Sequence, residues 1–339
     1  MKLQRSAIHP DAAFEYRAAT EGSAVYDVSH MGRLKASGAD ALDLLNRLST
    51  NKVVDLQPGQ GAPTILTTDR GRILDLVSVV NTSDYALLIT SPGTQPTVIA
   101  FLDKYTIMED LAVEDLTAST RMLAVFGPES QATLETAARM SLSDLPPYHT
   151  ALAEVGGCQA RIIHHPLAQL PGFYLVTSTE AAPRVWQELV DSGAAPVGDE
   201  AYEAVRVRWG IPAHGHEIGE EYNPLEAGLI GSIDFAKGCY IGQEVIARLD
   251  TYRKVQKHLV NLTFGPGSAV SEGAYLRLSG QIVGKVTSVA TNLATGETFG
   301  LAYVRKGTAT EATRLELQEP SEGMAEIQGL CQLFGPGQE

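Results

Sequence analysis

The sequence contains a weak internal repeat, and this repeat limits the possible folds of the chain more than any other pattern does. At residues 34–38 (LKASG) a short strand pattern ends in glycine, and a helical pattern of spaced leucines follows. Residues 123–127 (LAVFG) do the same 89 positions later. The stretches 88–91 (LITS) and 175–178 (LVTS), each a strand end followed by a helical pattern, lie 87 positions apart. Two anchors at nearly one offset predict two related α+β units.

The middle of the first unit has the pattern of an antiparallel meander. Two strand patterns, at 62–68 and 72–80, flank Asp-Arg-Gly at 69–71, which is a hairpin turn signal. A further turn at 81–84 leads into a third strand at 85–90. Neither G-x-G-x-x-G nor G-x-x-x-x-G-K-[ST] occurs between a strand and a helix. We therefore expect antiparallel sheets and not a doubly wound, nucleotide-binding fold.

The sequence changes in character near its last quarter. After residues 264–267 (FGPG), short strand patterns at 275–278, 282–289 and 299–304 alternate with turn residues. Short strands separated by Gly-rich turns are typical of a small barrel or sandwich. We place the domain boundary near residues 255–266.

The predicted fold class is therefore α+β, in three parts. Two related units with antiparallel sheets occupy residues 1–255, divided at about 1–115 and 116–255, and their strands could be interwoven. An all-β domain occupies residues 256–339. The length of 339 residues agrees with two to three domains at roughly 150 residues each.

Charge and cysteine content exclude several classes of function. The chain has 26 basic and 40 acidic residues, a net charge of −14, so we expect no nucleic-acid or anionic-membrane partner. No apolar run reaches the roughly 18–20 residues that span a bilayer, and the N-terminus shows no signal-peptide pattern. Cys158, Cys239 and Cys331 are too scattered for a disulfide framework or a cysteine-only metal site. We expect a cytoplasmic, reducing setting.

The most informative stretch is the octapeptide at residues 237–244 (KGCYIGQE). Its two glycines allow the backbone to turn tightly or to approach a ligand. A nearby ammonium raises the thiolate fraction of a cysteine, so Lys237 could activate Cys239 as a nucleophile or metal ligand. The alternative is that Cys239 is an inert, small apolar residue.

Other candidate groups carry weaker signals. His214, His216 and Glu217 lie close together in a loop, but no further ligand is evident, so we predict no metal site. Trp186 and Trp209 stand in helical patterns, which favours core positions over ligand stacking.

The octapeptide resembles the K-G-C-[FY]-x-G-Q-E signature of the YgfZ family. Residues 223–229 (NPLEAGL) resemble the matching segment of both YgfZ proteins and glycine-cleavage T-proteins. Residues 206–212 (RVRWGIP) stand in the place of the T-protein segment R-x-E-A-G. Residues 27–32 (DVSHMG) look like the D-x-S-H-M-G of T-proteins, and residues 284–288 (GKVTS) resemble the G-x-V-T-S of their barrel domain.

This resemblance covers essentially the whole chain and implies a fold and two kinds of activity. The fold is a three-lobed ring, two α+β units and a C-terminal β-barrel, with folate in a central channel. YgfZ-type proteins bind tetrahydrofolate and support the assembly or repair of iron–sulfur proteins. T-proteins are aminomethyltransferases, which move a one-carbon unit from a lipoyl carrier protein to tetrahydrofolate and release ammonia.

The resemblance also implies roles for particular residues. Cys239 would be the essential thiol, with Lys237 tuning it, and Asp75 would match the key acid of the T-protein I-x-D-D-L strand. A carboxylate there could orient a folate amine and stabilise developing positive charge. The implied folate-binding residues are Asp75, Arg206, Asn223, Glu226 and Lys237.

The chain departs from the T-protein pattern at two positions. Leu76 replaces the second Asp of the I-x-D-D-L strand. Arg208 replaces the Glu of R-x-E-A-G, which pairs with the amino-pyrimidine edge of the pterin. A guanidinium has only donors, so Arg208 cannot act as that bidentate acceptor.

Three hypotheses follow from these observations. The first is a tetrahydrofolate-binding protein that supports iron–sulfur protein maturation or repair through Cys239, with iron–sulfur client proteins as partners. The second is an aminomethyltransferase that uses Asp75 and a lipoyl carrier protein. The third is a folate-dependent scaffold without turnover.

Overall fold

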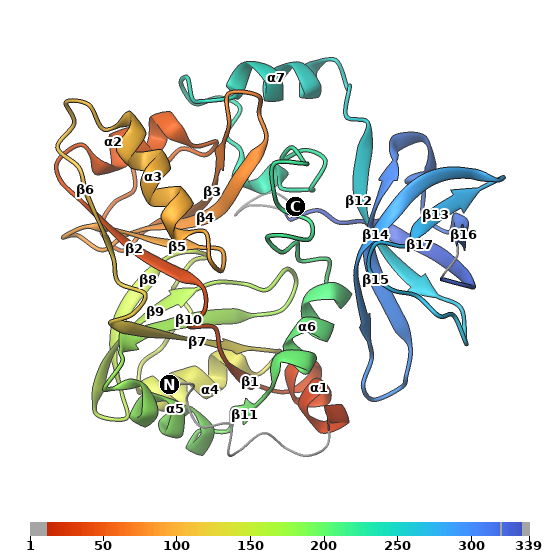
Figure 1. Cartoon of the computed structure of the whole chain (residues 1–339). Coiled ribbons are helices and arrows are strands. Elements are labelled where there is room, and N and C mark those ends of the chain that lie inside the picture. The colour runs from red at the N-terminus through yellow and green to blue at the C-terminus, as the bar shows by residue number, and fades with distance from the viewer. Residues whose placement is uncertain (1–11, 319–320, 334–339) are drawn as a thin grey trace.

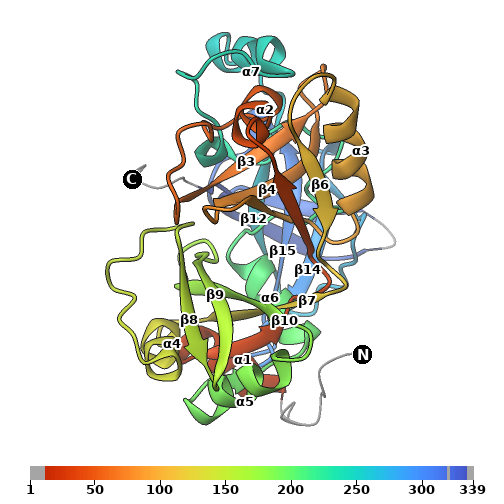
Figure 2. The same ribbon diagram turned by 90° about the vertical axis from the view of Figure 1, so that its left-hand side faces the viewer.

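The computed structural model describes residues 12–318 and 321–333, which form three lobes (Figure 1). Two lobes are α+β units with one sheet each, and the third is a closed six-stranded barrel. Figure 2 shows the two sheets one above the other, with the barrel behind them.

The first unit is built on a five-stranded antiparallel sheet with the order β3-β4-β5-β2-β6. Helix α2 buries Ala41, Leu44, Leu45 and Leu48, spaced as one helical face, against this sheet. The elements are β2 (Gly32–Ser37), α2 (Ala41–Leu48), β3 (Gly61–Thr67), β4 (Ile73–Asn81), β5 (Ala86–Thr90), α3 (Gln95–Tyr105) and β6 (Ala112–Asp115).

The second unit has a six-stranded sheet with the order β11-β1-β7-β10-β9-β8. Its strands are antiparallel except for the short pairing of β1 with β11. The elements are β1 (Ala24–Asp27), β7 (Thr120–Phe126), α4 (Ser130–Ala138), β8 (Thr150–Val155), β9 (Cys158–His164), β10 (Gly172–Ser178), α5 (Ala182–Asp191) and β11 (Ala195–Pro196).

The two sheets share one connectivity. In each, a strand and a helix are followed by three meandering strands, a second helix and a last strand, and β3-β4-β5-β2 matches β8-β9-β10-β7 in order. The second sheet differs because β1, from before the first unit, inserts between β7 and β11. Strand β1 is therefore hydrogen-bonded into the second sheet, although its residues precede position 115, where the predicted first unit ends.

Connecting helices lie between the units and the barrel. They are α1 (Ala12–Glu21), α6 (Asp199–Arg208), η1 (Ile230–Ser232) and α7 (Gln243–Thr251). The barrel comprises β12 (Lys257–Phe264), β13 (Tyr275–Leu278), β14 (Gln281–Thr291), β15 (Thr298–Arg305), η2 (Lys306–Thr308), β16 (Arg314–Leu317) and β17 (Met324–Leu330). Its strands close in the order β12-β15-β14-β13-β16-β17.

One apolar cluster joins the three lobes. It contains Ile65 of the first sheet, Tyr174 of the second and Phe299 of the barrel, all buried. Each lobe has a smaller core of its own besides. The predicted α+β fold with antiparallel sheets and a C-terminal barrel is confirmed. Within residues 12–318 and 321–333, every helix is too short or too polar to traverse a bilayer.

Candidate functional site

A cavity of about 540 Å³ opens where the three lobes meet. We call it the central cavity. Its walls come from β3 and β4, from β10 and residues 165–169, from the end of α6, and from β12 and β17 of the barrel. Small-molecule sites commonly measure roughly 300–1,000 Å³, so this cavity is large enough for a ligand of that class.

Aromatic side chains form much of the cavity wall. His165 stacks on Tyr174 with ring centroids 4.3 Å apart, and Tyr148 meets the same imidazole edge-on at 5.3 Å. The His165 Nε2 and Ser78 Oγ atoms are 3.2 Å apart, whereas His165 Nδ1 is buried and has no partner among the described residues. Burial lowers the pKa of His165 to about 4, so the ring is neutral at pH 7. The wall therefore combines flat apolar faces with a free ring nitrogen.

Arg208 brings the only charged side chain among the described residues that line this cavity. Its guanidinium lies 5.7 Å from the centre of the Phe299 ring. In the described part of the chain it forms no hydrogen bond or ion pair, and it is exposed. The cavity thus offers free donors to an acceptor group, at the position where T-proteins carry a Glu.

Asp75 lies outside the lining of the central cavity. Its carboxylate is fully buried, and Oδ2 accepts hydrogen bonds from Ser91 N (3.0 Å) and Thr94 Oγ1 (2.6 Å) at the start of α3. Asp75 pairs with Leu66, which packs on the helix-covered side of the sheet, while the next residue, Leu76, lines the cavity. Burial raises the pKa of Asp75.

Two buried polar atoms near this position are unpartnered. Asp75 Oδ1 and His214 Nδ1 have no hydrogen-bond partner among the described residues. The two groups interact electrostatically, because His214 lowers the pKa of Asp75 against the larger effect of burial. Buried polar atoms without partners are rare in folded proteins, and they mark places where a ligand or water can supply the missing bond.

Asn223 and Glu226 are hydrogen-bonded to each other within one turn. Asn223 Oδ1 accepts from Leu225 N (3.1 Å) and Glu226 N (3.0 Å), and Glu226 Oε2 accepts from Asn223 N at 3.3 Å. Burial raises the pKa of Glu226, and the nearby cations Lys257 and Arg72 oppose that effect. Both predicted folate-binding side chains therefore have structural bonds, and Glu226 also faces two cations.

The buried Lys237 side chain is hydrogen-bonded to the backbone of the first unit. Its Nζ donates to the carbonyl oxygens of Asn46 (2.6 Å), Ser49 (2.7 Å) and Asn51 (2.7 Å). These carbonyls lie at and just beyond the C-terminal end of α2, where a cation is favoured. Burial lowers the pKa of Lys237 to about 8. An ammonium has three donors, so none remains for the Cys239 thiol.

The rest of the octapeptide fixes a loop and leaves Cys239 exposed. Tyr240 is buried beside the Lys237 ammonium. Gly242 has φ +82°, and a Cβ there would lie 2.5 Å from the Thr68 carbonyl oxygen, so only glycine suits this position. The loop is therefore rigidly anchored and presents one thiol to solvent just before α7.

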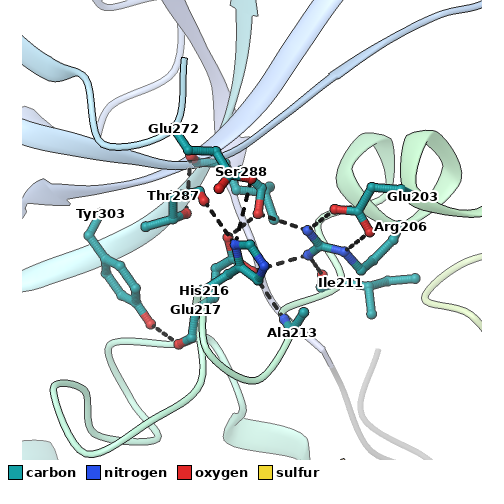
Figure 3. Close-up of polar contacts among 11 residues, drawn as sticks. Glu203, Arg206, Ile211, Ala213, His216, Glu217, Glu272, Thr287, Ser288 and Tyr303 are labelled. Atoms are coloured by element: carbon teal, nitrogen blue, oxygen red, sulfur yellow. Dashed lines mark hydrogen bonds and ion pairs between the residues drawn. The ribbon is translucent and has the colours of Figure 1, made fainter. Parts of the chain in front are cut away.

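Arg206 anchors helix α6 to the barrel (Figure 3). Its guanidinium donates to both carboxylate oxygens of Glu203, to a backbone carbonyl, to Glu217 Oε2 (3.1 Å) and to Ser288 Oγ (2.7 Å). Ser288 Oγ donates in turn to Glu217 Oε1 at 2.6 Å, and the Tyr303 hydroxyl donates to the Glu217 carbonyl. All five N–H donors are used. Arg206 therefore has no free donor in this structure, and its role in folate binding stays a prediction.

The loop residues His216 and Glu217 are engaged in contacts with the barrel and with Arg206. Glu217 belongs to the Arg206 network, and His216 Nδ1 lies 3.3 Å from the Thr287 carbonyl and 3.6 Å from Glu272 Oε1 (Figure 3). Within the described residues, no three His, Cys, Asp or Glu side chains are grouped as metal ligands. Trp186 packs against the core of the second unit, and Trp209 packs against the cluster that joins the lobes, as expected; Trp209 also lines the central cavity.

The residues singled out by sequence do not converge on one point. Lys237 and Cys239 lie on the α7 side, Asp75 lies beneath α3, and Arg206 lies at the barrel. Sequence reasoning missed the cavity wall of Tyr148, His165, Tyr174 and Tyr202. These aromatic residues are scattered along the second unit without a motif, so only the folded chain groups them.

Comparison with known proteins identifies the class. The chain matches the GCVT N-terminal domain over residues 3–237 and the glycine cleavage T-protein C-terminal barrel domain over residues 257–326. The chain therefore belongs to the glycine cleavage T-protein family.

Individual relatives agree with this assignment. A chloroplastic protein of Arabidopsis thaliana, whose name describes it as a transferase, is 33% identical over 89% of this chain and 70% of its own length. An aminomethyltransferase of Rubrobacter xylanophilus is 29% identical over 86% of this chain and 78% of its own length. The crystal structure of the glycine cleavage aminomethyltransferase T of Bartonella henselae matches the fold with a TM-score of 0.83, covering 96% of this chain and 92% of that one at 21% identity. The expected T-protein superfamily is confirmed.

Proposed function

We propose that the chain is a tetrahydrofolate-binding protein that supports the maturation or repair of iron–sulfur proteins through Cys239. The observation that carries this proposal is the contrast within the octapeptide. Lys237, Tyr240 and Gly242 have structural contacts, whereas the Cys239 side chain is exposed on an anchored loop. A thiol presented in this way can reach an iron or sulfur species on a partner protein. The cytoplasmic setting stays a prediction.

The central cavity supports folate binding by contacts unlike those of aminomethyltransferases. Its aromatic wall suits a flat pterin ring, and the free nitrogen of His165 can bond a ring donor. Arg208 cannot accept from the amino-pyrimidine edge, but it can donate to a pterin carbonyl or to the carboxylates of the glutamate tail. Bound tetrahydrofolate would supply a reduced pterin that accepts or carries a one-carbon unit.

Replacing Cys239 with alanine is expected to abolish function without disturbing the fold. Because the side chain is exposed, the free energy of unfolding should change by less than about 0.5 kcal/mol. The measurement is the activity of [4Fe–4S] enzymes in cells that lack the chain and receive either version. We expect Cys239→Ala to restore no more activity than an empty vector.

Cys158→Ala provides the matched control, because Cys158 is also a free cysteine but lies outside the octapeptide. This variant should restore activity fully. Full restoration by Cys239→Ala would instead leave a scaffold or an aminomethyltransferase, neither of which needs the thiol.

The second candidate function is aminomethyl transfer from a lipoyl carrier protein. The buried Asp75 carboxylate with its unpartnered Oδ1 favours it, because such an acid could bind a folate amine. Ammonia release from an aminomethylated carrier, dependent on tetrahydrofolate and lost in Asp75→Asn, would establish this activity.

Calorimetric titration with tetrahydrofolate tests the folate site directly. We expect saturable binding in the central cavity, which Asp75 does not line, so Asp75→Asn should leave the affinity unchanged under the first proposal. If a folate amine instead reaches the buried carboxylate, as the second candidate function requires, Asp75→Asn should bind at least tenfold more weakly, a difference of about 1.4 kcal/mol. Asn keeps an oxygen for Ser91 N and Thr94 Oγ1, so this variant changes charge more than shape.

Arg208→Glu in the same experiment shows which contacts the ligand makes. Tighter binding would mean that Arg208 had weakened a T-protein-like pocket, whereas weaker binding would mean that Arg208 itself contacts folate. Absence of binding to the unmodified chain would overturn both folate-dependent functions.

A further inference from the structure

A second cavity of about 520 Å³ lies at the seam between the two α+β units. We call it the seam cavity. It shares no lining residue with the central cavity. Figure 1 labels β2 and β5 of the first sheet next to β8, β9 and β10 of the second, and residues of these strands line the cavity. The rest of its lining comes from the start of β7 and the residue before α5.

The seam cavity is positively charged in an acidic protein. Arg33 and Arg161 line it, and no Asp or Glu is among the described residues of its wall. The chain as a whole has a net charge of −14, so this local excess of arginine is not a consequence of composition. A wall of one charge sign in a partly enclosed space raises the local concentration of counter-ions.

Arg33 provides a buried charge that no carboxylate neutralises. Its side chain is fully buried, and it donates to Thr120 Oγ1 and to the carbonyls of Ser29, Met31, Thr117 and Thr120. These partners are neutral. Asp115 and Asp27 act on it only at longer range, while Arg121 opposes them, and burial lowers the pKa of Arg33 to about 10. The N–H donors of Arg33 are all used within the protein, and no carboxylate contacts them, so its positive charge can stabilise an anion bound nearby without a direct hydrogen bond.

Arg161 provides the donors that a ligand could use. It projects from β9 with an intermediate exposure, and within the described residues its guanidinium makes no hydrogen bond or ion pair. Asp84 and Tyr85 lie close enough to influence its pKa, which burial lowers. A free, half-buried guanidinium is suited to bidentate pairing with a carboxylate or a phosphate.

The remaining wall is apolar. Leu87, Leu116, Leu152 and Val176 line the same cavity, and Leu152 is 53% exposed on the surface of an otherwise well-packed sheet. An exposed apolar side chain beside a charged group is suited to a ligand that has both an apolar part and a charged part. The Cys158 thiol, at intermediate exposure, lies in the same wall and can report on occupancy.

We propose that the seam cavity binds a small organic anion, a carboxylate or phosphate carried on an apolar or aromatic body. Arg161 pairs with the anionic group, the buried charge of Arg33 stabilises it at longer range, and the leucines cover the body. This site is independent of the proposed folate site.

The experiment uses phenyl phosphate, benzoate and the neutral benzyl alcohol as probes, titrated calorimetrically into the full chain. We expect saturable binding of at least one anion, and which anion binds distinguishes phosphate from carboxylate. Benzyl alcohol should bind at least tenfold more weakly. Arg161→Gln should weaken anion binding at least tenfold. Arg305→Gln, an exposed arginine on the barrel, is the matched control and should bind as the unmodified chain does.

Thiol alkylation tests whether the ligand occupies the seam cavity. A saturating anion should slow alkylation of Cys158 severalfold, followed peptide by peptide by mass spectrometry, while the exposed Cys239 serves as the internal reference. The proposal is overturned if neither anion binds, if Arg161→Gln leaves affinity unchanged, or if both thiols are protected equally.

Discussion

Replacing Arg206 with methionine is expected to lower the free energy of unfolding by about 3–5 kcal/mol, the usual cost of removing one partner of a buried ion pair. Glu217 is fully buried, and its carboxylate accepts hydrogen bonds from Arg206, Ser288 Oγ and Ala213 N. Without the guanidinium, a buried negative charge keeps only two neutral donors, the Ser288 hydroxyl and the Ala213 N–H, and has no positive partner. Urea denaturation measures the change directly.

Two variants make this prediction specific. Arg208→Met removes an arginine two positions away that has no ion pair among the described residues, and it should change stability by less than about 0.5 kcal/mol. The double variant Arg206→Met with Glu217→Gln removes both charges, and it should recover part of the loss. Equal effects of Arg206→Met and Arg208→Met would show that the network contributes little to stability.

The fold could be predicted because its signals are local. The meander of β3, β4 and β5 follows from short strand patterns on either side of turn residues, including Gly71 at φ +66°. The sequence repeat, a strand followed by a helix at a nearly constant spacing, corresponds in the structure to two sheets whose strands have the same order. The insertion of β1 between β7 and β11 has no such local signal, because strand exchange depends on contacts about 100 to 170 residues apart.

The site could be predicted only in part, for a related reason. The sequence placed Arg208 where T-proteins have a Glu, and this side chain does line the central cavity. It could not distinguish Arg206 from a ligand contact, since Ser288, one of its partners, is 82 positions away. Nor could it separate the anchoring role of Lys237 from activation of Cys239, because the Asn46 and Asn51 carbonyls belong to a distant helix end.

His165→Gln is expected to make the chain less sensitive to acid. In the folded chain the pKa of His165 is about 4, against about 6.5 when unfolded, so the unfolded state binds more protons between these values. Stability from the neutral ring is fully present above pH 6.5 and is lost as the pH falls through 4. At pH 4.5 the loss from this group is on the order of 2–3 kcal/mol. The fall in unfolding free energy from pH 7.5 to 4.5 should be smaller by that amount in the variant.

The difference between two pH values isolates the titration of His165 from the packing that the substitution also changes. His165 stacks on Tyr174 and contacts Ser78, so His165→Gln alters stability at both pH values, and that part cancels. His164→Gln, at the adjacent position, controls for loss of a histidine from the same segment and should retain most of the acid sensitivity, because burial is the main cause of the low pKa of His165. An unchanged fall in His165→Gln would show that the ring is solvated or charged in the folded chain. The free Nδ1 would then be a consequence of water entering the central cavity and not a site kept for a ligand.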